Sequence, residues 1–189
     1  MNKEVKKNMY GFYELVEKPT PEYLNEWYEK EYYRNNCSKA YAQTYNEQEI
    51  KWIKNNIKLV HQVIKKIKNL NETKPKLLDI GCGEGWVLQY FHEEGWDVSG
   101  LDINSFGIEN HNPAMLNYFQ QGDIYKSLTQ LGEQKYDIIW LSEVLQIVLD
   151  PVLLIKLIKN PLKKNSSQIG VMIIIFVIKS RFKMEPCLK

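Results

Sequence analysis

The sequence contains few cysteines, and their spacing excludes two kinds of stabilising site. Only Cys37, Cys82 and Cys187 occur in 189 residues; they lie far apart and form no C-x-x-C pair. A disulfide framework or a cysteine-rich zinc site needs more cysteines at closer spacing. We therefore expect no metal site and a reducing compartment, which favours a cytoplasmic protein.

The sequence also lacks a long apolar segment. Residues 169–178 are strongly apolar but number only ten, whereas a membrane helix needs about 20 apolar residues. This segment is predicted to be a buried strand, and no membrane span is expected. The charged start at residues 1–7 is followed by no apolar stretch typical of a signal peptide.

The chain also carries almost no excess of charge of one sign. The chain carries 25 Lys and Arg against 23 Asp and Glu, a net charge of +2. The lysines are spread along the sequence and form no basic stripe, so no nucleic-acid partner is expected. Apolar residues make up 44% of the chain, which is enough for one globular core.

A glycine-rich turn follows the first strongly apolar strand of the second half. Leu77–Ile80 is predicted to be a buried strand, and Gly81, Gly83 and Gly85 follow directly before a helical pattern. Glycine tolerates sharp bends and close approach because it has no Cβ. In open α/β sheets, ligands bind at such turns, outside the carboxyl ends of the strands.

The residues around this turn indicate the kind of ligand. The third glycine comes one residue earlier than in the dinucleotide fingerprint, where Trp86 stands instead. Asp79 and Glu84 would repel a phosphate and suit a cation. Asp102 ends the next predicted strand, where a ribose-binding carboxylate belongs. A positively charged nucleoside without phosphate fits these features, as S-adenosylmethionine does. A nicotinamide or nucleotide-sugar ligand is the disfavoured alternative.

Four motifs in order resemble those of the class I S-adenosylmethionine-dependent methyltransferases. They are residues 77–85, 100–104, 122–124 and 136–141. Residues 10–14 and 31–33 are further similar to a bacterial branch associated with surface-polysaccharide genes. The resemblance implies a methyltransferase with a small-molecule or glycan-precursor acceptor. The Asn/Asp-Pro-Pro-Tyr signature of enzymes that methylate nucleic-acid bases is missing.

The resemblance also implies which residues contact the cofactor. Asp79 would face its ammonium group, Asp102 would accept its ribose hydroxyls, and Asp123 and Ile124 would flank its adenine. The expected cofactor-binding set is Asp79, Gly81, Cys82, Gly83, Gly85, Asp102, Ile103, Asp123, Ile124 and Leu141. As alternatives, Asp79 would only stabilise the loop, Asp102 would only cap the following helix and Asp123 would only be a turn residue.

The expected catalytic residues are not identifiable. Relatives usually read Val-Leu-Glu-His after the fourth strand, but this chain reads Val-Leu-Gln-Ile at 144–147. Glu143 and Asp150 are the acids that remain nearby, and His61, His92 and His111 are expected to be packing or surface residues. A second interpretation is therefore a methyltransferase-like domain that only binds the cofactor, or has lost it.

Helices and strands are expected to form an α/β, Rossmann-like, mostly parallel sheet with a helical N-terminal extension. Residues 1–19 are expected to be irregular, with helices after Thr20 and after Asn46. Tyr33, Tyr41 and Tyr45 either close over the cofactor or only pack. Residues 1–70 would form the extension and 71–189 the cofactor domain. Five strands are predicted, at 77–80, 97–102, 118–121, 136–141 and 169–178.

Few residues follow the fifth predicted strand. Residues 179–189 are basic and contain Pro186, so they cannot supply the two further strands of the related fold. We expect a truncated chain in which residues 171–177 leave an exposed sheet edge. Such an edge favours self-association.

Overall fold

The computed structural model describes residues 4–32, 44–67, 74–133, 135–162 and 173–176. The chain divides into two compact units, and the larger one spans residues 41–179. The described residues before it form a small unit of their own.

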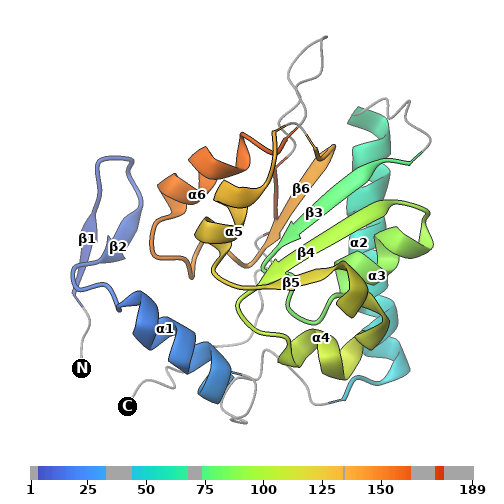
Figure 1. The fold of residues 1–189 in the computed structure, drawn as a ribbon, viewed down its shortest axis with the longest axis horizontal. Helices are drawn as coiled ribbons and strands as arrows, with labels where there is room; N and C mark the ends of the chain where they lie inside the picture. The colour runs from blue at the N-terminus through green and yellow to red at the C-terminus, as the bar shows by residue number, and fades with distance from the viewer. Residues whose placement is uncertain (1–3, 33–43, 68–73, 134, 163–172, 177–189) are drawn as a thin grey trace. The chain divides into compact units, whose positions relative to one another are not determined.

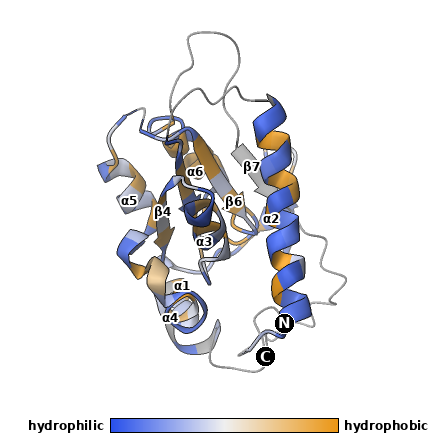
Figure 2. Ribbon diagram, turned by 90° about the vertical axis from the view of Figure 1, so that its right-hand side faces the viewer, coloured by the Kyte–Doolittle hydropathy of each residue, from blue (hydrophilic) through white to orange (hydrophobic). Residues whose placement is uncertain are grey.

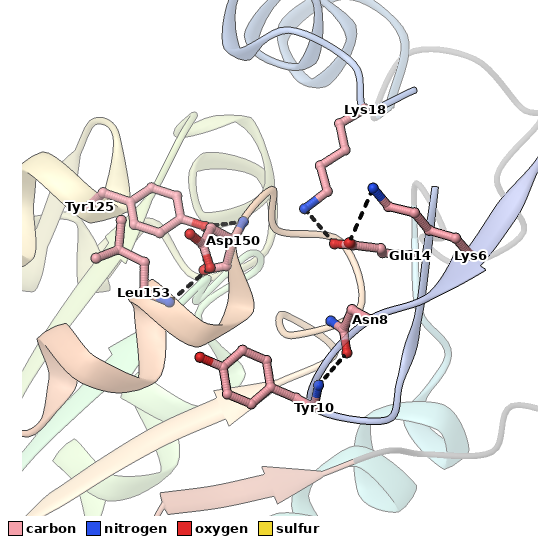
Figure 3. Close-up of polar contacts among 8 residues, drawn as sticks. All are labelled: Lys6, Asn8, Tyr10, Glu14, Lys18, Tyr125, Asp150 and Leu153. Atoms are coloured by element: carbon pink, nitrogen blue, oxygen red, sulfur yellow. Dashed lines mark hydrogen bonds and ion pairs between the residues drawn. The ribbon is translucent and has the colours of Figure 1, made fainter. Parts of the chain in front are cut away.

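The small unit begins with a hairpin rather than the irregular segment expected from the sequence. Strands β1 (Val5–Lys7) and β2 (Tyr13–Leu15) pair antiparallel. Asn8 accepts a hydrogen bond from the Tyr10 backbone N–H, and Gly11 has a φ of 89° (Figure 3). Asn8 and Gly11 form a turn that was not predicted from the sequence, although both residue types favour turns.

A helix follows the hairpin where the sequence predicts it. Helix α1 (Pro21–Trp27) continues into a π-helix, η1 (Tyr28–Tyr32). Thr20 accepts a hydrogen bond from the Tyr23 backbone N–H at 3.2 Å, as expected of a cap before a proline at the first helical position.

The larger unit is built on a five-stranded sheet in which every pair is parallel. The strand order is β5-β4-β3-β6-β7. The strands are β3 (Lys76–Ile80), β4 (Asp97–Asp102), β5 (Phe119–Gln121), β6 (Ile138–Ser142) and β7 (Ile173–Phe176). The predicted parallel Rossmann-like sheet is therefore confirmed; the outer residues of the predicted strand 169–178 lie outside the described residues.

Helices cover both faces of this sheet (Figure 1). They are α2 (Glu47–Ile67), α3 (Trp86–Glu93), α4 (Phe106–His111), the 3₁₀ helix η2 (Pro113–Tyr118), α5 (Ile124–Gln130) and α6 (Pro151–Ile158). Helix α5 and η2 were not predicted, because residues 113–130 lack a sustained apolar period.

The two faces of the sheet explain the continuous apolar runs of its strands. On β6, Ile138 and Trp140 pack with α2 and α3, whereas Ile139 and Leu141 pack with α5 and α6. Successive side chains of a strand point to opposite faces, and both faces are covered here. Figure 2 accordingly shows mostly hydrophobic residues along β6.

Helix α2 belongs to the same core as the sheet. Ile57 and Ile64 are buried in one core with Leu77 and Phe91, and the helix begins with a capping box between Asn46 and Glu49. Helix α2 therefore lies within the larger unit, which begins at residue 41, and its apolar stripe packs against α3. None of the described helices is long and apolar enough to cross a membrane.

Candidate functional site

The glycine turn joins β3 to α3 in a conformation that other residues rarely adopt. Gly81, Gly83 and Gly85 have φ values of 70°, 52° and 76°. The backbone N–H groups of Gly81 and Cys82 both donate to the carbonyl oxygen of Leu101, at 2.7 and 3.2 Å. The turn is thus fixed to the end of β4.

Two of these glycines are needed for packing as well as for conformation. A Cβ at Gly81 would lie 2.5 Å from Val144 Cγ2, and one at Gly85 would lie 2.9 Å from Ile108 Cγ1. The sequence predicted the sharp bend, but it gave no signal for these packing contacts. The loop after β6 and helix α4 therefore pack directly against the turn.

Asp102 points toward the turn from the end of β4. Its Oδ2 accepts a hydrogen bond from the Gly83 N–H at 2.8 Å, and its Oδ1 accepts one from the Ile103 N–H at 2.7 Å. Asp102 does not cap α4; Asn104 instead accepts from the Phe106 N–H at 3.1 Å. The carboxylate therefore holds the turn in place while remaining at the carboxyl edge of the sheet.

Asp79 and Asp102 form a buried acidic pair. They are 3% and 9% exposed and come from neighbouring parallel strands. Burial raises the pKa of Asp79 well above its ordinary value, and the charge of Asp102 raises it further. Burial also raises the pKa of Asp102, partly offset by the N–H groups that it accepts.

No basic side chain among the described residues forms an ion pair with either carboxylate. An acidic pair without a basic partner favours a cationic ligand and opposes a phosphate.

The same acidic pair influences Cys82, which is buried inside the turn. Burial raises the pKa of its thiol, and the charges of Asp79 and Asp102 act in the same direction. A thiol held neutral in this way is a packing group rather than a nucleophile.

Glu84 is engaged by the side chains of three other residues. It accepts hydrogen bonds from the Tyr45 hydroxyl at 2.9 Å and from Trp86 Nε1 at 2.6 Å. His111 Nε2 lies 3.5 Å from Glu84 Oε1. The sequence identified Glu84 as a loop carboxylate but gave no signal for this grouping, since its partners lie far apart in the chain.

The motif after β5 reaches the same edge of the sheet. The Gly122 N–H donates to the Asp102 carbonyl oxygen at 2.8 Å. Asp123 caps α5 by accepting from the Lys126 N–H at 2.9 Å, and Ile124 packs partly buried against the second core. Asp123 is thus a helix cap by geometry.

The residues after β6 are held by packing and by hydrogen bonds. Leu141 is 1% exposed and packs into the core, so only its backbone lies at the sheet edge. Asp150 caps α6, accepting from the Leu153 N–H at 2.9 Å, and its own N–H donates to the Tyr125 hydroxyl (Figure 3). Glu143 has a φ of 59° and accepts a hydrogen bond from Gln146.

The remaining expected residues are distributed as follows. Tyr33 and Tyr41 lie outside the described residues. His61 is buried in the core, and the exposed His92 ring lies tilted against that of Tyr118. Within the part of the chain that the structure describes, no three His, Cys, Asp or Glu side chains converge as a metal site.

The chain matches the family described as "Methyltransferase domain" over residues 52–173. It therefore belongs to this family, for which S-adenosylmethionine is the implied cofactor.

Curated relatives bear the name ubiquinone biosynthesis O-methyltransferase. The protein from Histophilus somni is 30% identical over 49% of this chain and 42% of its own length. The protein from Photorhabdus laumondii is 35% identical over 40% of this chain and 33% of its own length. The chain thus matches less than half of either relative.

Among solved structures, an S-adenosylmethionine-dependent methyltransferase from Archaeoglobus fulgidus is 26% identical. The similarity covers 58% of this chain and 50% of that chain, with a TM-score of 0.46.

Proposed function

We propose that this chain binds S-adenosylmethionine at the carboxyl edge of β3 and β4 and transfers its methyl group to an oxygen of a small molecule. One observation carries the proposal. Asp79 and Asp102 form a buried acidic pair beside a glycine turn, without a basic partner among the described residues. Such a pair suits an ammonium group and a ribose diol, and it disfavours a pyrophosphate.

Each residue of the site would contact a different part of the cofactor. Asp79 would face the ammonium group and Asp102 the ribose hydroxyls, while the turn from Gly81 to Gly85, with Cys82, supplies a backbone that lies close to the ligand. Ile103, Asp123, Ile124 and the backbone of Leu141 would border the rest of the cofactor. Asp102 serves two roles in this proposal, since it also accepts the Gly83 N–H.

The reaction needs alignment and a proton acceptor. When bound, S-adenosylmethionine supplies a methyl carbon on a positively charged sulfur, which an acceptor oxygen displaces in line while the bond electrons leave with the sulfur. Glu143 would take up the acceptor's proton. It stands at the carboxyl end of β6 in a strained backbone conformation, with φ 59°, and such strain is concentrated at functional sites.

The proposed class of methyl acceptor is supported by the names of the curated relatives. Their names specify O-methylation, which favours a hydroxyl acceptor. A glycan precursor of the surface-polysaccharide type also presents hydroxyls and is the narrower candidate. Gln146 and Ile147, both exposed, replace the ionisable pair of the motif; this favours a second candidate, a domain that binds the cofactor without turnover.

Calorimetry with S-adenosylhomocysteine and, separately, NAD tests the proposal. We expect the first ligand alone to bind. Asp102→Ala should weaken that binding by roughly 1–3 kcal/mol, the scale for lost charged hydrogen bonds. Asp97→Ala, at the opposite end of the same strand, is the matched control and should leave the affinity unchanged.

Two outcomes separate the alternatives. Binding of NAD in place of S-adenosylhomocysteine would refute the proposal. The binding-only domain would be favoured if the chain binds S-adenosylhomocysteine but forms none from S-adenosylmethionine when hydroxylated aromatic and sugar acceptors are present.

A further inference from the structure

Glu84 joins three separate segments at the glycine turn. Its carboxylate accepts hydrogen bonds from Tyr45, just before α2, and from Trp86, at the start of α3. His111, the last residue of α4, lies 3.5 Å away. Glu84 is only 6% exposed, so these contacts lie in a largely water-free environment, where hydrogen bonds to a carboxylate are strong.

Ring contacts surround the same carboxylate. The Tyr45 ring centroid lies 5.0 Å from that of His111 and 5.9 Å from that of Trp86. The Trp86 and His111 rings are 6.0 Å apart. Three rings thus pack around one acid, and the backbone carbonyl of Glu84 also accepts from Asn112 Nδ2 at 2.7 Å.

Glu84 lies between Gly83 and Gly85, so whatever fixes its side chain also fixes the turn. Burial raises the pKa of Glu84, and the hydrogen bonds from Trp86 and Tyr45 act in the opposite direction, as does the neighbouring His111. The donors therefore compensate for the buried acid. Removing one donor would leave part of the carboxylate unsatisfied and loosen the turn.

We propose that Glu84 is a positioning residue, which holds the Tyr45 ring against the glycine turn and thereby makes the segment before α2 part of the cofactor site. The inference rests on the proposed cofactor function. It assigns Glu84 no direct contact with the ligand. The acid acts by fixing the backbone between Gly83 and Gly85 and by placing Tyr45 beside it.

Calorimetry on the full chain with S-adenosylhomocysteine tests this inference. The variants are Tyr45→Phe, Glu84→Ala and their combination. Tyr45→Phe removes one oxygen and keeps the ring, so folding should be preserved. We expect each single change to weaken binding at least about tenfold. The double variant should bind no more weakly than Glu84→Ala, because the Tyr45 hydroxyl has already lost its acceptor in Glu84→Ala.

Tyr90→Phe is the matched control. The Tyr90 hydroxyl lies 3.2 Å from His61 Nδ1 in the core, so its removal also disturbs a buried polar pair. A general loss of stability would weaken binding in Tyr90→Phe and Tyr45→Phe alike. Positioning by Glu84 requires that Tyr90→Phe retain the wild-type affinity.

The possible failures differ in what they refute. If the wild type does not bind S-adenosylhomocysteine, both the proposed function and this inference are wrong. If the wild type binds and Tyr45→Phe binds equally well, only the role of Glu84 and Tyr45 is refuted. Single effects that multiply in the double variant would likewise show that the two residues act independently.

Discussion

At the scale of single residues, Gly81 is restricted in two ways. Its φ of 70° lies in the left-handed region, and an added Cβ would meet Val144 Cγ2 at 2.5 Å. The first restriction costs a side chain roughly 1–2 kcal/mol, and overpacking adds about 1–3 kcal/mol. These two costs can be separated experimentally, because another glycine carries only the first.

We expect Gly81→Ala to lower the free energy of unfolding by about 2–5 kcal/mol in urea denaturation, the sum of these two costs. Gly95→Ala is the matched control, since Gly95 has a φ of 84° but no atom within 4 Å of an added Cβ. It should lose only about 1–2 kcal/mol. Equal losses in the two variants would show that contact with Val144 contributes nothing.

Asp79 illustrates a conflict between stability and function. Because burial raises its pKa in the folded protein, the folded state holds the proton more tightly than the unfolded chain. The contribution of Asp79 to the stability of the ligand-free protein is then most favourable at low pH. It falls as the pH rises from the ordinary value of about 3.9 through the folded pKa.

Asp79→Asn should therefore raise the free energy of unfolding at pH 7.5, with a smaller gain at pH 5. The same change should weaken S-adenosylhomocysteine binding about tenfold, the scale of one charged hydrogen bond. Urea denaturation and calorimetry provide the two measurements. A variant that is less stable at pH 7.5, or that binds normally, would contradict this role for Asp79.

Sequence reasoning at this scale located the acids but not all of their contacts. Asp102 follows a strand and precedes a helix, and that local pattern was enough to place it at the carboxyl edge. The partners of Glu84 were not predictable, because Tyr45 and His111 come from other segments and nothing in their local pattern indicates the fold that brings them together. Leu141 was placed correctly at a strand end, but its side chain points into the core.

At the scale of elements, α2 shows how a helix is started by its own sequence. Asn46 Oδ1 accepts from the Glu49 N–H at 3.0 Å, and Glu49 Oε2 accepts from the Asn46 N–H at 2.8 Å. This reciprocal pair was predictable from the spacing of the two residues. The hairpin and α5 were missed for the opposite reason, since they depend on turn chemistry and a single Asp123 cap rather than on an apolar period.

Removing the cap should destabilise the larger unit, because α2 is packed into its core. We expect Asn46→Ala to lower the free energy of unfolding by about 1 kcal/mol. Gln48→Ala, an exposed change in the first turn of the same helix, should have little effect. Indistinguishable denaturation midpoints for the two variants would argue against the capping box.

At the scale of the whole molecule, the core on the α2 side of the sheet contains a buried histidine, His61. His61 is 2% exposed and packs against Phe91 and Trp96. Its Nδ1 lies 3.2 Å from the Tyr90 hydroxyl and 3.7 Å from Glu94 Oε2, and its Nε2 has no hydrogen-bond partner among the described residues.

Burial lowers the pKa of His61 in the folded protein; the charge of Lys65 acts in the same direction and that of Glu94 opposes it. The unfolded chain therefore takes up the proton first. Stability should be lost as the pH falls below the ordinary histidine value of about 6.5. His61→Phe keeps the aromatic packing and should reduce this loss between pH 7.5 and 5.5. Parallel stability curves for the two proteins would exclude His61 as the cause.

The arrangement of the larger unit places the ends of β3, β4, β5 and β6 at one edge, and the central claim is that this edge binds S-adenosylmethionine. Titration of the isotope-labelled chain with S-adenosylhomocysteine, followed by NMR of the backbone amides, tests the claim most directly. We predict saturable shifts at Gly81, Gly83 and Gly85 and at residues 102–104, with little change along the outer face of α2. Saturable shifts confined to other elements, or none at millimolar ligand, would contradict it.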